Sequence, residues 1–382
     1  MSKRIICAVM VLAMAALMFG CGAPAAKGSA SSASAATTTQ SEAGTHKVVD
    51  HAGNTVEVPN KINRIAVCDI LPLPSVLSIF FDSAEKIVGM AEPSMTAAKN
   101  SLLSKLYPEI LKADTGFIKG TTVNTEELLK LKPDVVFYSA SSPDLGEQLK
   151  SAGFAAVAIS VNKWNYNSIE TLNHWIELLS EIFPDNDKTE IVAKKSSEIY
   201  DMVQKRVSGI ADKDRARAFF LFKYSESSIT TSGKQFFGQW WADAIGAKNV
   251  ASELTKDNSV EVSMEQIYKW NPNLIFVTNF TEAQPDDIYK STIGNYDWSN
   301  IDAVKSKRVY KMPLGMYRSY TPGADTPITL LWLAKTAYPD LFKDIDVTKE
   351  AKDYYKTVFG ISLTDEQIQS IFTPVSGAAA GF

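Results

Sequence analysis

The alternation of apolar and polar positions predicts a long helix in the middle of the chain. After Pro184, apolar residues recur at helical spacing between charged ones, and they comprise Val192, Ile199, Val203, Val207 and Ile210. At about 1.5 Å per residue, a helix from 188 to 210 spans roughly 35 Å, about the width of a small domain. Its apolar stripe is narrow, so we expect it to lie across other units rather than inside one.

The same hydrophobic pattern occurs twice, once on each side of this helix. Residues 124–138 (NTEELLKLKPDVVFY) align without a gap with residues 263–277 (SMEQIYKWNPNLIFV). Each copy begins with capping residues, continues as a helix, stops at a proline and ends in an apolar strand. The repeat predicts two related halves on one connecting helix.

Short apolar strands alternate with helical patterns through both halves. The strands are expected at 64–69, 86–89, 134–138 and 156–160 in the first half, and at 218–224, 229–231, 274–278 and 308–312 in the second. This order predicts two three-layer α/β lobes joined by one long rigid helix, with a ligand cleft between the lobes. The expected boundaries are 46–183 for the first lobe, 184–211 for the connecting helix, 212–375 for the second lobe and 376–382 for a tail that frays from Gly377 on.

The first 45 residues predict export and attachment rather than a folded core. Lys3 and Arg4 precede an apolar run that ends in Gly20-Cys21, which is the pattern of an export signal. The final Gly-Cys resembles a lipobox, so residues 1–21 are interpreted as a lipoprotein signal peptide with lipid attachment at Cys21. The alternative is an ordinary signal peptide with an incidental cysteine. Residues 22–45 are mostly Ala, Ser, Thr and Gly, which is typical of a flexible tether.

Composition excludes several classes of function. The chain has 382 residues, of which 45% are hydrophobic, enough to form two cores. The formal charge of −4, without a basic cluster, argues against nucleic acid as a partner. The three histidines lack metal-ligand spacing, and no nucleophile elbow or phosphate-binding loop is present. We therefore expect no catalytic residues, no metal site and no intrinsic cofactor, and an exported enzyme is the weaker hypothesis.

Candidate ligand-binding residues lie in the loops that follow the predicted strands, because open α/β sheets bind ligands outside the carboxyl ends of their strands. The most distinctive loop is 314–326, in which Tyr317, Arg318 and Tyr320 precede a predicted helix. Arg318 can bind carboxylates and other oxyanions, while tyrosine rings can stack on a ligand. The alternative is a surface arginine paired with a neighbouring carboxylate. The other candidates are Leu71, Ser139, Trp164, Tyr166, Tyr224 and Phe280, of which Trp164 and Tyr166 could equally belong to a core.

Glu126 and Glu265 occupy equivalent positions in the first turns of the two repeated helices. An acidic residue there can simply complement the helix dipole. It can also present one acidic contact per lobe to basic pockets on a partner protein. The residues alone do not decide between the two interpretations.

Two segments carry a resemblance to a known family. Residues 50–59 (DHAGNTVEVP), followed by 63–67 (NRIAV), resemble the opening of the class III periplasmic-binding-protein family for iron complexes and corrinoids. Residues 126–134 (EELLKLKPD) and their second-lobe counterpart are similar to family segments as well, and the resemblance covers roughly residues 46–345. It implies two lobes on a rigid helix that close little on a ligand, and delivery of the ligand to an ABC permease and its ATPase.

The resemblance also implies a ligand, a location and a docking mode. The expected ligand is an iron complex, first of all a ferric siderophore; heme, a corrinoid or a nickel or cobalt chelate stay open. Arg318 would meet its anionic groups. The protein would be a monomer, lipid-anchored to the cell membrane and facing outward, into the periplasm or the extracellular space. Glu126 would dock with arginines of the permease, and the second docking glutamate would be Glu265 or Glu253. An exported sensor subunit on the same scaffold is the alternative from a different class.

Overall fold

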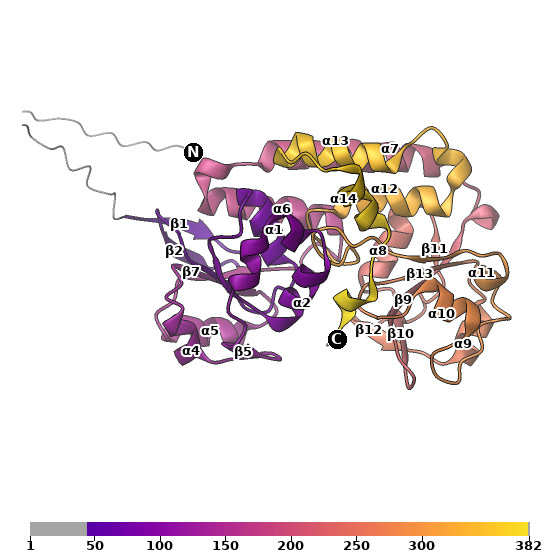
Figure 1. Ribbon diagram of the computed structural model, residues 1–382, viewed down its shortest axis with the longest axis horizontal. Helices are drawn as coiled ribbons and strands as arrows, with labels where there is room; N and C mark the ends of the chain where they lie inside the picture. Colours follow the sequence, from indigo (N-terminus) through magenta and orange to yellow (C-terminus); the bar gives the residue numbers. More distant parts are fainter. Residues whose placement is uncertain (1–43, 381–382) are drawn as a thin grey trace, which may run out of the picture. The chain divides into compact units, whose positions relative to one another are not determined.

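Figure 1 shows a computed structural model of the chain, which describes residues 44–380. The expected signal peptide, lipid attachment at Cys21 and most of the tether lie outside the described residues. Two separate large sheets, one from strands before the helix Thr189–Val207 and one from strands after it, form the centres of what we call the N-terminal lobe and the C-terminal lobe. Mixed α/β architecture in two lobes is the fold class that the sequence predicts.

The N-terminal lobe contains a four-stranded parallel sheet in the order β4-β3-β7-β8. Its strands are β3 (Ile65–Val67), β4 (Ile87–Met90), β7 (Val135–Ser139) and β8 (Ala156–Ile159). Alternate strand residues face two different apolar clusters, so both faces of the sheet are covered, as is usual for parallel strands. The lobe also holds the hairpins β1 (Thr45–Val49)–β2 (Thr55–Pro59) and β5 (Ile118–Lys119)–β6 (Thr122–Val123), and the helices α1 (Leu73–Phe81), α2 (Glu92–Asn100), α3 (Leu103–Leu106), α4 (Thr125–Lys130) and α5 (Pro143–Ser151).

The C-terminal lobe contains a mixed sheet in the order β12-β10-β9-β13-β14, with β11 also paired to β9. Strands β9, β13 and β14 run parallel, while β10 and β12 are antiparallel to their neighbours. The strands are β9 (Arg217–Tyr224), β10 (Ile229–Ser232), β11 (Lys248–Asn249), β12 (Ser259–Glu261), β13 (Leu274–Val277) and β14 (Val309–Lys311). The helices of this part are α8 (Phe237–Ala244), α9 (Met264–Trp270), α10 (Pro285–Lys290) and α11 (Asp302–Lys305).

The long helix that the sequence predicts is α7 (Thr189–Val207). It contacts α6 (Ser168–Ile182), which precedes it, and α8, α12 (Thr326–Ala337) and α13 (Val347–Phe359), which follow it in the chain (Figure 1). It ends a few residues earlier than predicted, just before Ser208-Gly209, where glycine disfavours a helix. The chain finishes with α14 (Asp365–Phe372) and a short 3-10 turn (Ser376–Ala379).

The internal repeat is a structural duplication. Strand β7 pairs in parallel with β3, and β13 pairs in parallel with β9, in the same register. At the start of each pair, a side-chain oxygen accepts from the backbone N–H of an arginine: Asp134 from Arg64 at 2.9 Å, and Asn273 from Arg217 at 2.8 Å. The sequence predicts a capping box at both helices; Ser263 and Gln266 form one on α9, whereas on α4 the Asn124 side chain accepts from the backbone of Glu126 and Glu127. The two repeats therefore place their strands in the same way.

The described part of the expected tail is folded rather than frayed. In the described part of the tail, residues 376–379 form the 3-10 turn, and Ala378 and Ala379 are buried. The reason is a specific partner: the carbonyl oxygen of Ala378 accepts hydrogen bonds from the side chain of Arg318.

Candidate functional site

The loop between β14 and α12 connects the two lobes directly. The backbone N–H of Leu102 donates to the carbonyl of Gly315 at 3.0 Å, and the hydroxyl of Ser101 donates to the carbonyl of Met316 at 3.3 Å. Both donors belong to the N-terminal lobe, while the acceptors belong to the C-terminal lobe. The loop with the predicted anion-binding residues therefore lies where the lobes meet.

Arg318 is fully buried in this loop rather than on the surface. Its Nε and Nη2 atoms donate to the carbonyl oxygen of Ala378 at 2.8 and 2.5 Å, and its Nη1 atom donates to the hydroxyl of Tyr317 at 2.7 Å. The guanidinium carbon lies 5.0 Å from the ring centre of Phe280 and 5.2 Å from that of Tyr317, within cation–π range. Arg318, Tyr317 and Phe280 thus form one cluster, as a ligand site would need.

A second cation, Lys223, lies near Arg318. Burial, and then the positive charge of Arg318, lower the pKa of Lys223 below its usual value. This residue could not be identified from the sequence, because a lysine near the end of a strand has no distinctive pattern. Lys223 is thus a half-buried cation and Arg318 a fully buried one near the carboxyl ends of strands.

A cavity of about 420 Å³ adjoins the cluster, a size suited to a small-molecule ligand. Lys223, Tyr224, Phe280 and Ala379 line it, together with residues 225, 226, 228, 281–283 and 293. It lies at the carboxyl ends of β9 and β13, where the fold predicts a ligand.

The buried ammonium group of Lys311 fixes the loop that carries Phe280. It donates to the carbonyls of Thr278, Thr281 and Ala283 at 2.9, 2.7 and 2.7 Å. Burial lowers the pKa of Lys311 to about 7. Sequence reasoning missed this residue as well, since its strand position alone does not show that the ammonium group turns inward.

The tyrosines predicted as aromatic walls have different surroundings. The hydroxyl of Tyr224 donates to the carbonyl of Ile293 at 2.7 Å and accepts from the indole N–H of Trp298 at 3.0 Å, while its ring contributes to the cavity wall. Tyr320 is fully buried, with its ring near those of Phe220, Phe222 and Phe236. The structure therefore places Tyr317 and Tyr224 beside Arg318 or the cavity, and Tyr320 in the core behind them.

The two candidates of the N-terminal lobe sheet lie at its carboxyl edge: Leu71 follows β3, and Ser139 is the last residue of β7. The backbone N–H of Ser139 donates to a carboxylate oxygen of Asp69 at 2.6 Å. The other oxygen of Asp69 accepts from the hydroxyl of Ser142 at 2.7 Å. The hydroxyl of Ser94 donates to the carbonyl of Leu71 at 2.8 Å. These bonds fix the loops of Leu71 and Ser139.

Trp164 and Tyr166 are neighbours in sequence but contact different lobes. The Trp164 ring stacks on His174, with centres 4.3 Å apart, inside the N-terminal lobe. The Tyr166 hydroxyl donates to the carbonyl of Asp257 at 2.7 Å, and its ring packs against Phe237 in the C-terminal lobe. Tyr166 has a φ of 60°, which is rare for a bulky residue and turns its side chain toward the other lobe. The ring of Tyr166 thus contacts the C-terminal lobe, whereas the ring of Trp164 stacks within the N-terminal lobe.

The predicted docking glutamates are exposed. Glu126 and Glu265 lie in the first turns of α4 and α9. Hydrogen bonds from Ser263 and from its own backbone N–H hold the pKa of Glu265 below its usual value, so its carboxylate stays charged. Glu253 is also exposed but accepts from the indole N–H of Trp270 at 2.9 Å. Glu126 and Glu265 are thus the equivalent pair in structure as well as in sequence.

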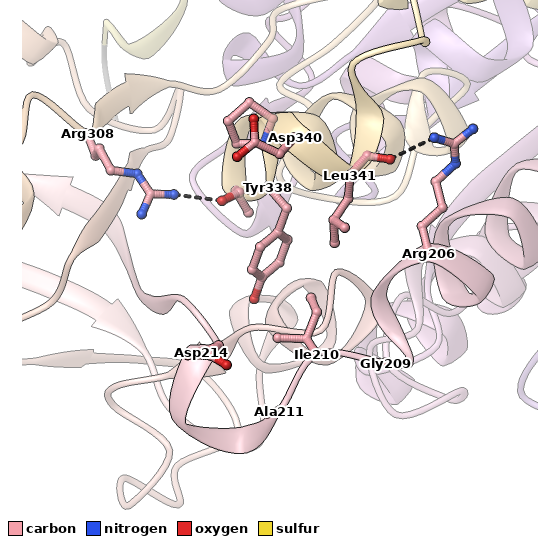
Figure 2. A pocket seen from close by; sticks show the side chains of 11 residues that line it. Arg206, Gly209, Ile210, Ala211, Asp214, Arg308, Tyr338, Asp340 and Leu341 are labelled. Atoms are coloured by element: carbon pink, nitrogen blue, oxygen red, sulfur yellow. Dashed lines mark hydrogen bonds between the residues drawn. The ribbon is translucent and has the colours of Figure 1, made fainter.

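A larger cavity of about 730 Å³ lies elsewhere, at the end of α7 (Figure 2). Arg206 donates there to the carbonyl of Leu341, and Arg308 to that of Ala337, each at 2.7 Å. Arg308 immediately precedes β14, so this cavity adjoins the amino end of the strand, opposite the edge where ligands bind. We therefore place the candidate site at Arg318.

Residues 44–380 contain no cluster of three or more His, Cys, Asp or Glu side chains that could hold a metal ion. Within the same range, no helix combines the length and the apolar character needed to cross a membrane.

Comparison with known proteins gives a consistent family. The model of the periplasmic binding protein family matches residues 82–314. Among curated proteins, the molybdate-binding protein MolA of Haemophilus influenzae is 27% identical over 334 residues, covering 82% of this chain and 91% of MolA. The uncharacterized ABC transporter substrate-binding lipoprotein YvrC of Bacillus subtilis is 26% identical and covers 78% and 87%. The iron(3+)-hydroxamate-binding protein YxeB of the same organism is 21% identical and covers 53% and 62%.

Solved structures agree in fold. A periplasmic solute binding protein from Veillonella parvula superposes with a TM-score of 0.75 at 31% identity, covering 86% of this chain and 97% of the other. The structure of MolA bound to molybdate superposes with a TM-score of 0.70 at 26% identity, covering 84% and 99%.

Proposed function

We propose that this chain, which belongs to the periplasmic binding protein family, captures an anionic metal complex for import. As a family member it is the substrate-binding protein of an ABC importer, acting outside the cytoplasm with a permease and its ATPase. The family consists of transport proteins that bind ligands such as metal complexes rather than carry intrinsic cofactors, and its members are not enzymes. The identity of the ligand, the lipid anchor and the docking residues are the parts that we propose.

The proposal that the ligand is an anion is based on the buried guanidinium of Arg318 and on the ammonium group of Lys223 near it. Removing a cation from water is costly, and an anion at close range offsets that cost better than a neutral group does. The Nε and Nη2 atoms lie on one edge of the guanidinium and both donate to the Ala378 carbonyl oxygen. The same edge can donate two parallel hydrogen bonds to two oxygens of a carboxylate or another oxyanion.

The first candidate is a ferric siderophore with anionic oxygen groups. Phe280, Tyr224 and Tyr317 supply aromatic surface beside Arg318, and Leu71 and Ser139 lie at the corresponding edge of the other lobe. The similarity to the iron(3+)-hydroxamate-binding protein supports a ferric siderophore as the kind of ligand, while the anionic charge is inferred from Arg318 alone. Heme, a corrinoid and a nickel or cobalt chelate are alternatives of the same class.

The second candidate is molybdate, favoured by the similarity to MolA over 82% of this chain. Molybdate is a compact oxyanion, so the arginine donors suit it without any aromatic wall. A titration that includes both kinds of ligand separates the candidates.

The test is isothermal titration of the purified chain with a ferric tris-catecholate, a neutral ferric tris-hydroxamate, molybdate, and sulfate as a reference anion. We expect the tris-catecholate or molybdate to bind. We expect Arg318→Ala to weaken that binding roughly 10- to 100-fold, since a hydrogen bond to a charged group contributes about 1.5–3 kcal/mol. Arg215→Ala, which alters an exposed arginine, is the matched control and should leave binding unchanged. Equal affinity of wild type and Arg318→Ala would reject the proposed site.

We also propose that the chain is anchored by a lipid on Cys21 and docks on its permease through Glu126 and Glu265, with Glu253 as the alternative in the second lobe. The support is the Gly20-Cys21 motif and the equivalent, exposed positions of Glu126 and Glu265 on the repeated helices. Cys21→Ala should release the protein from membranes, as measured by fractionation. An unchanged distribution of the protein between the membrane and soluble fractions would reject the lipid anchor.

A further inference from the structure

The last described residues of the chain lie in the candidate site. Ser376–Ala380, which we call the strap, follow α14, and Ala378 is fully buried. Figure 1 shows this yellow end of the chain between the N-terminal and C-terminal lobes. The strap packs on α2 of the N-terminal lobe and accepts from Arg318 of the C-terminal lobe. It therefore touches both sides of the region where a ligand is expected.

The strap occupies the position in which an oxygen of an anionic ligand would accept hydrogen bonds from Arg318. The carbonyl oxygen of Ala378 accepts from both Nε and Nη2, the two donors that converge on a single oxygen. A carbonyl oxygen carries only a partial charge, whereas an anionic oxygen carries a larger one and is attracted more strongly by the guanidinium at the same distance. An anionic ligand oxygen would therefore be the better acceptor at the same place.

The strap also forms a wall of the cavity beside Arg318. Ala379 lines the 420 Å³ cavity together with Lys223, Tyr224 and Phe280. Movement of the strap away from this position would join the cavity to the guanidinium of Arg318. The space available to a ligand thus depends on the strap.

The sequence of the strap favours displacement. Ser376-Gly377-Ala378-Ala379-Ala380 has no side chain larger than serine, so its docking buries little apolar surface. Before it, Thr373 and Val375 are exposed, so the connection itself contributes little to the core.

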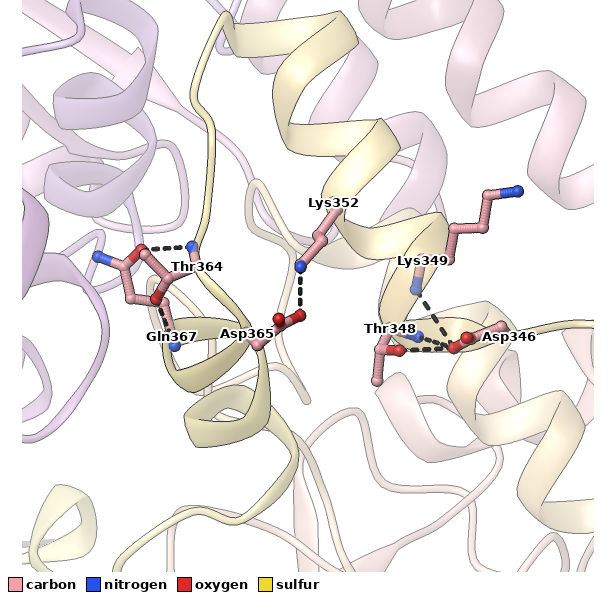
Figure 3. A network of polar contacts seen from close by, with 7 residues as sticks. All are labelled: Asp346, Thr348, Lys349, Lys352, Thr364, Asp365 and Gln367. Carbon is pink, nitrogen blue, oxygen red and sulfur yellow. Dashed lines mark hydrogen bonds and ion pairs between the residues drawn. The ribbon is translucent and has the colours of Figure 1, made fainter.

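The helix that carries the strap is, in contrast, firmly attached. Ile368 and Ile371 of α14 are buried in the core. Thr364 forms a capping box with Gln367 at the start of α14, and Asp365 forms an ion pair with Lys352 of α13 (Figure 3). An anchored helix, an exposed connection and a short docked end form the arrangement of a tethered competitor.

We infer that the strap is a displaceable competitor of the ligand: it and the ligand bind the same two N–H donors of Arg318, one at a time. The inference rests on the proposed function, since it takes Arg318 as the ligand's binding residue. If the strap is docked in about nine molecules of ten, only about one molecule in ten can bind the ligand, and the apparent affinity is about tenfold weaker than that of the undocked protein.

The test compares the full chain with a variant that ends at Thr373, which keeps α14 intact. Both are titrated with sodium molybdate and with a ferric tris-catecholate, after circular dichroism and thermal unfolding have shown that both are folded. We expect the truncated chain to bind the active probe about tenfold more tightly.

A point variant tests the same idea without truncation. A Cβ atom on Gly377 would lie 2.5 Å from the Oδ1 atom of Asn100, whose side chain is held by a 2.9 Å hydrogen bond to the carbonyl of Thr96. Gly377→Ala should therefore lift the strap and tighten ligand binding. The double variant Gly377→Ala, Asn100→Ala removes the clash and should return the affinity toward that of the wild type.

Amide hydrogen exchange of residues 376–380 provides the independent readout. We expect protection in the full chain that falls when the probe is added and that is low in Gly377→Ala. Equal affinity of the full and truncated chains, or protection that persists with the probe bound, would overturn the inference and leave the proposed function standing. Failure of every probe to bind either chain would instead contradict the proposed function, and with it the role of the strap as a competitor.

Discussion

Asp325 gives the sharpest prediction about the loop that carries Arg318. Its carboxylate lies just before α12, accepts from the backbone N–H of Met316 at 2.8 Å and from the hydroxyl of Tyr355, and is almost completely buried. Burial raises the pKa of Asp325 to about 7. The carboxyl group is therefore protonated in the folded protein over a pH range in which it is ionised in the unfolded chain.

The sign of the effect follows from proton binding. Between about pH 4 and pH 7 the folded state holds one more proton at Asp325 than the unfolded state, so the free energy of unfolding falls as the pH rises. Each tenfold change in proton affinity corresponds to about 1.4 kcal/mol, so ionisation of Asp325 costs the fold roughly 4 kcal/mol. His51 opposes this trend, because burial lowers the pKa of His51 to about 4 and its folded form binds fewer protons below about pH 6.5.

His51 contributes equally to the free energies of unfolding of the wild type and of Asp325→Asn, so its contribution cancels in the difference between them. Asparagine keeps an oxygen that can accept from Met316 but cannot ionise. We expect urea unfolding to show that the variant gains stability over the wild type by several kcal/mol as the pH is raised from about 4 to about 7. A stability difference that stays constant over this range would refute the assignment of a raised pKa to Asp325.

Three further predictions test other parts of the account. A Cβ on Gly315 would lie 2.0 Å from the Oδ1 atom of Asp325, so Gly315→Ala should lower the free energy of unfolding in urea by about 1–3 kcal/mol. The control is Gly323→Ala, whose Cβ meets nothing within 4 Å and which should leave that free energy unchanged. Equal effects of the two substitutions would contradict the packing of the loop. Lys311→Met leaves three buried carbonyls without their donor and should lower the free energy of unfolding by about 3 kcal/mol or more, and an unchanged value would show that these bonds contribute little. Glu126→Lys should leave ligand binding in titrations intact and abolish ligand uptake by cells, so normal uptake would reject the docking role.

The lobes could be predicted from sequence because their signals are local. The repeated pattern of capped helix, proline and apolar strand appears in both lobes with matching registers, and Asn124 and Ser263 cap their helices as the spacing indicates. Loop 314–326 could be identified as well, since Arg318 stands between a strand and a helix whose start is marked by Pro327.

The contacts inside the site could not be predicted because they depend on the three-dimensional fold. Residues 376–380 (SGAAA) have no periodic pattern, so nothing in the sequence indicates that they dock on Arg318. Trp164 and Tyr166 have similar side chains, but the left-handed backbone at Tyr166 directs only that ring to the other lobe. Tyr320 resembles Tyr317 in sequence context, yet it lies in the aromatic core rather than beside the guanidinium.

The central claim is that Arg318 binds an anionic ligand between the two lobes. The most direct measurement is a crystal structure of the chain with the probe that titration shows to bind. We predict a ligand oxygen within hydrogen-bond distance of Nε and Nη2 of Arg318, at the position of the Ala378 carbonyl. A ligand bound elsewhere, for example in the cavity at the end of α7, would contradict it (Figure 2).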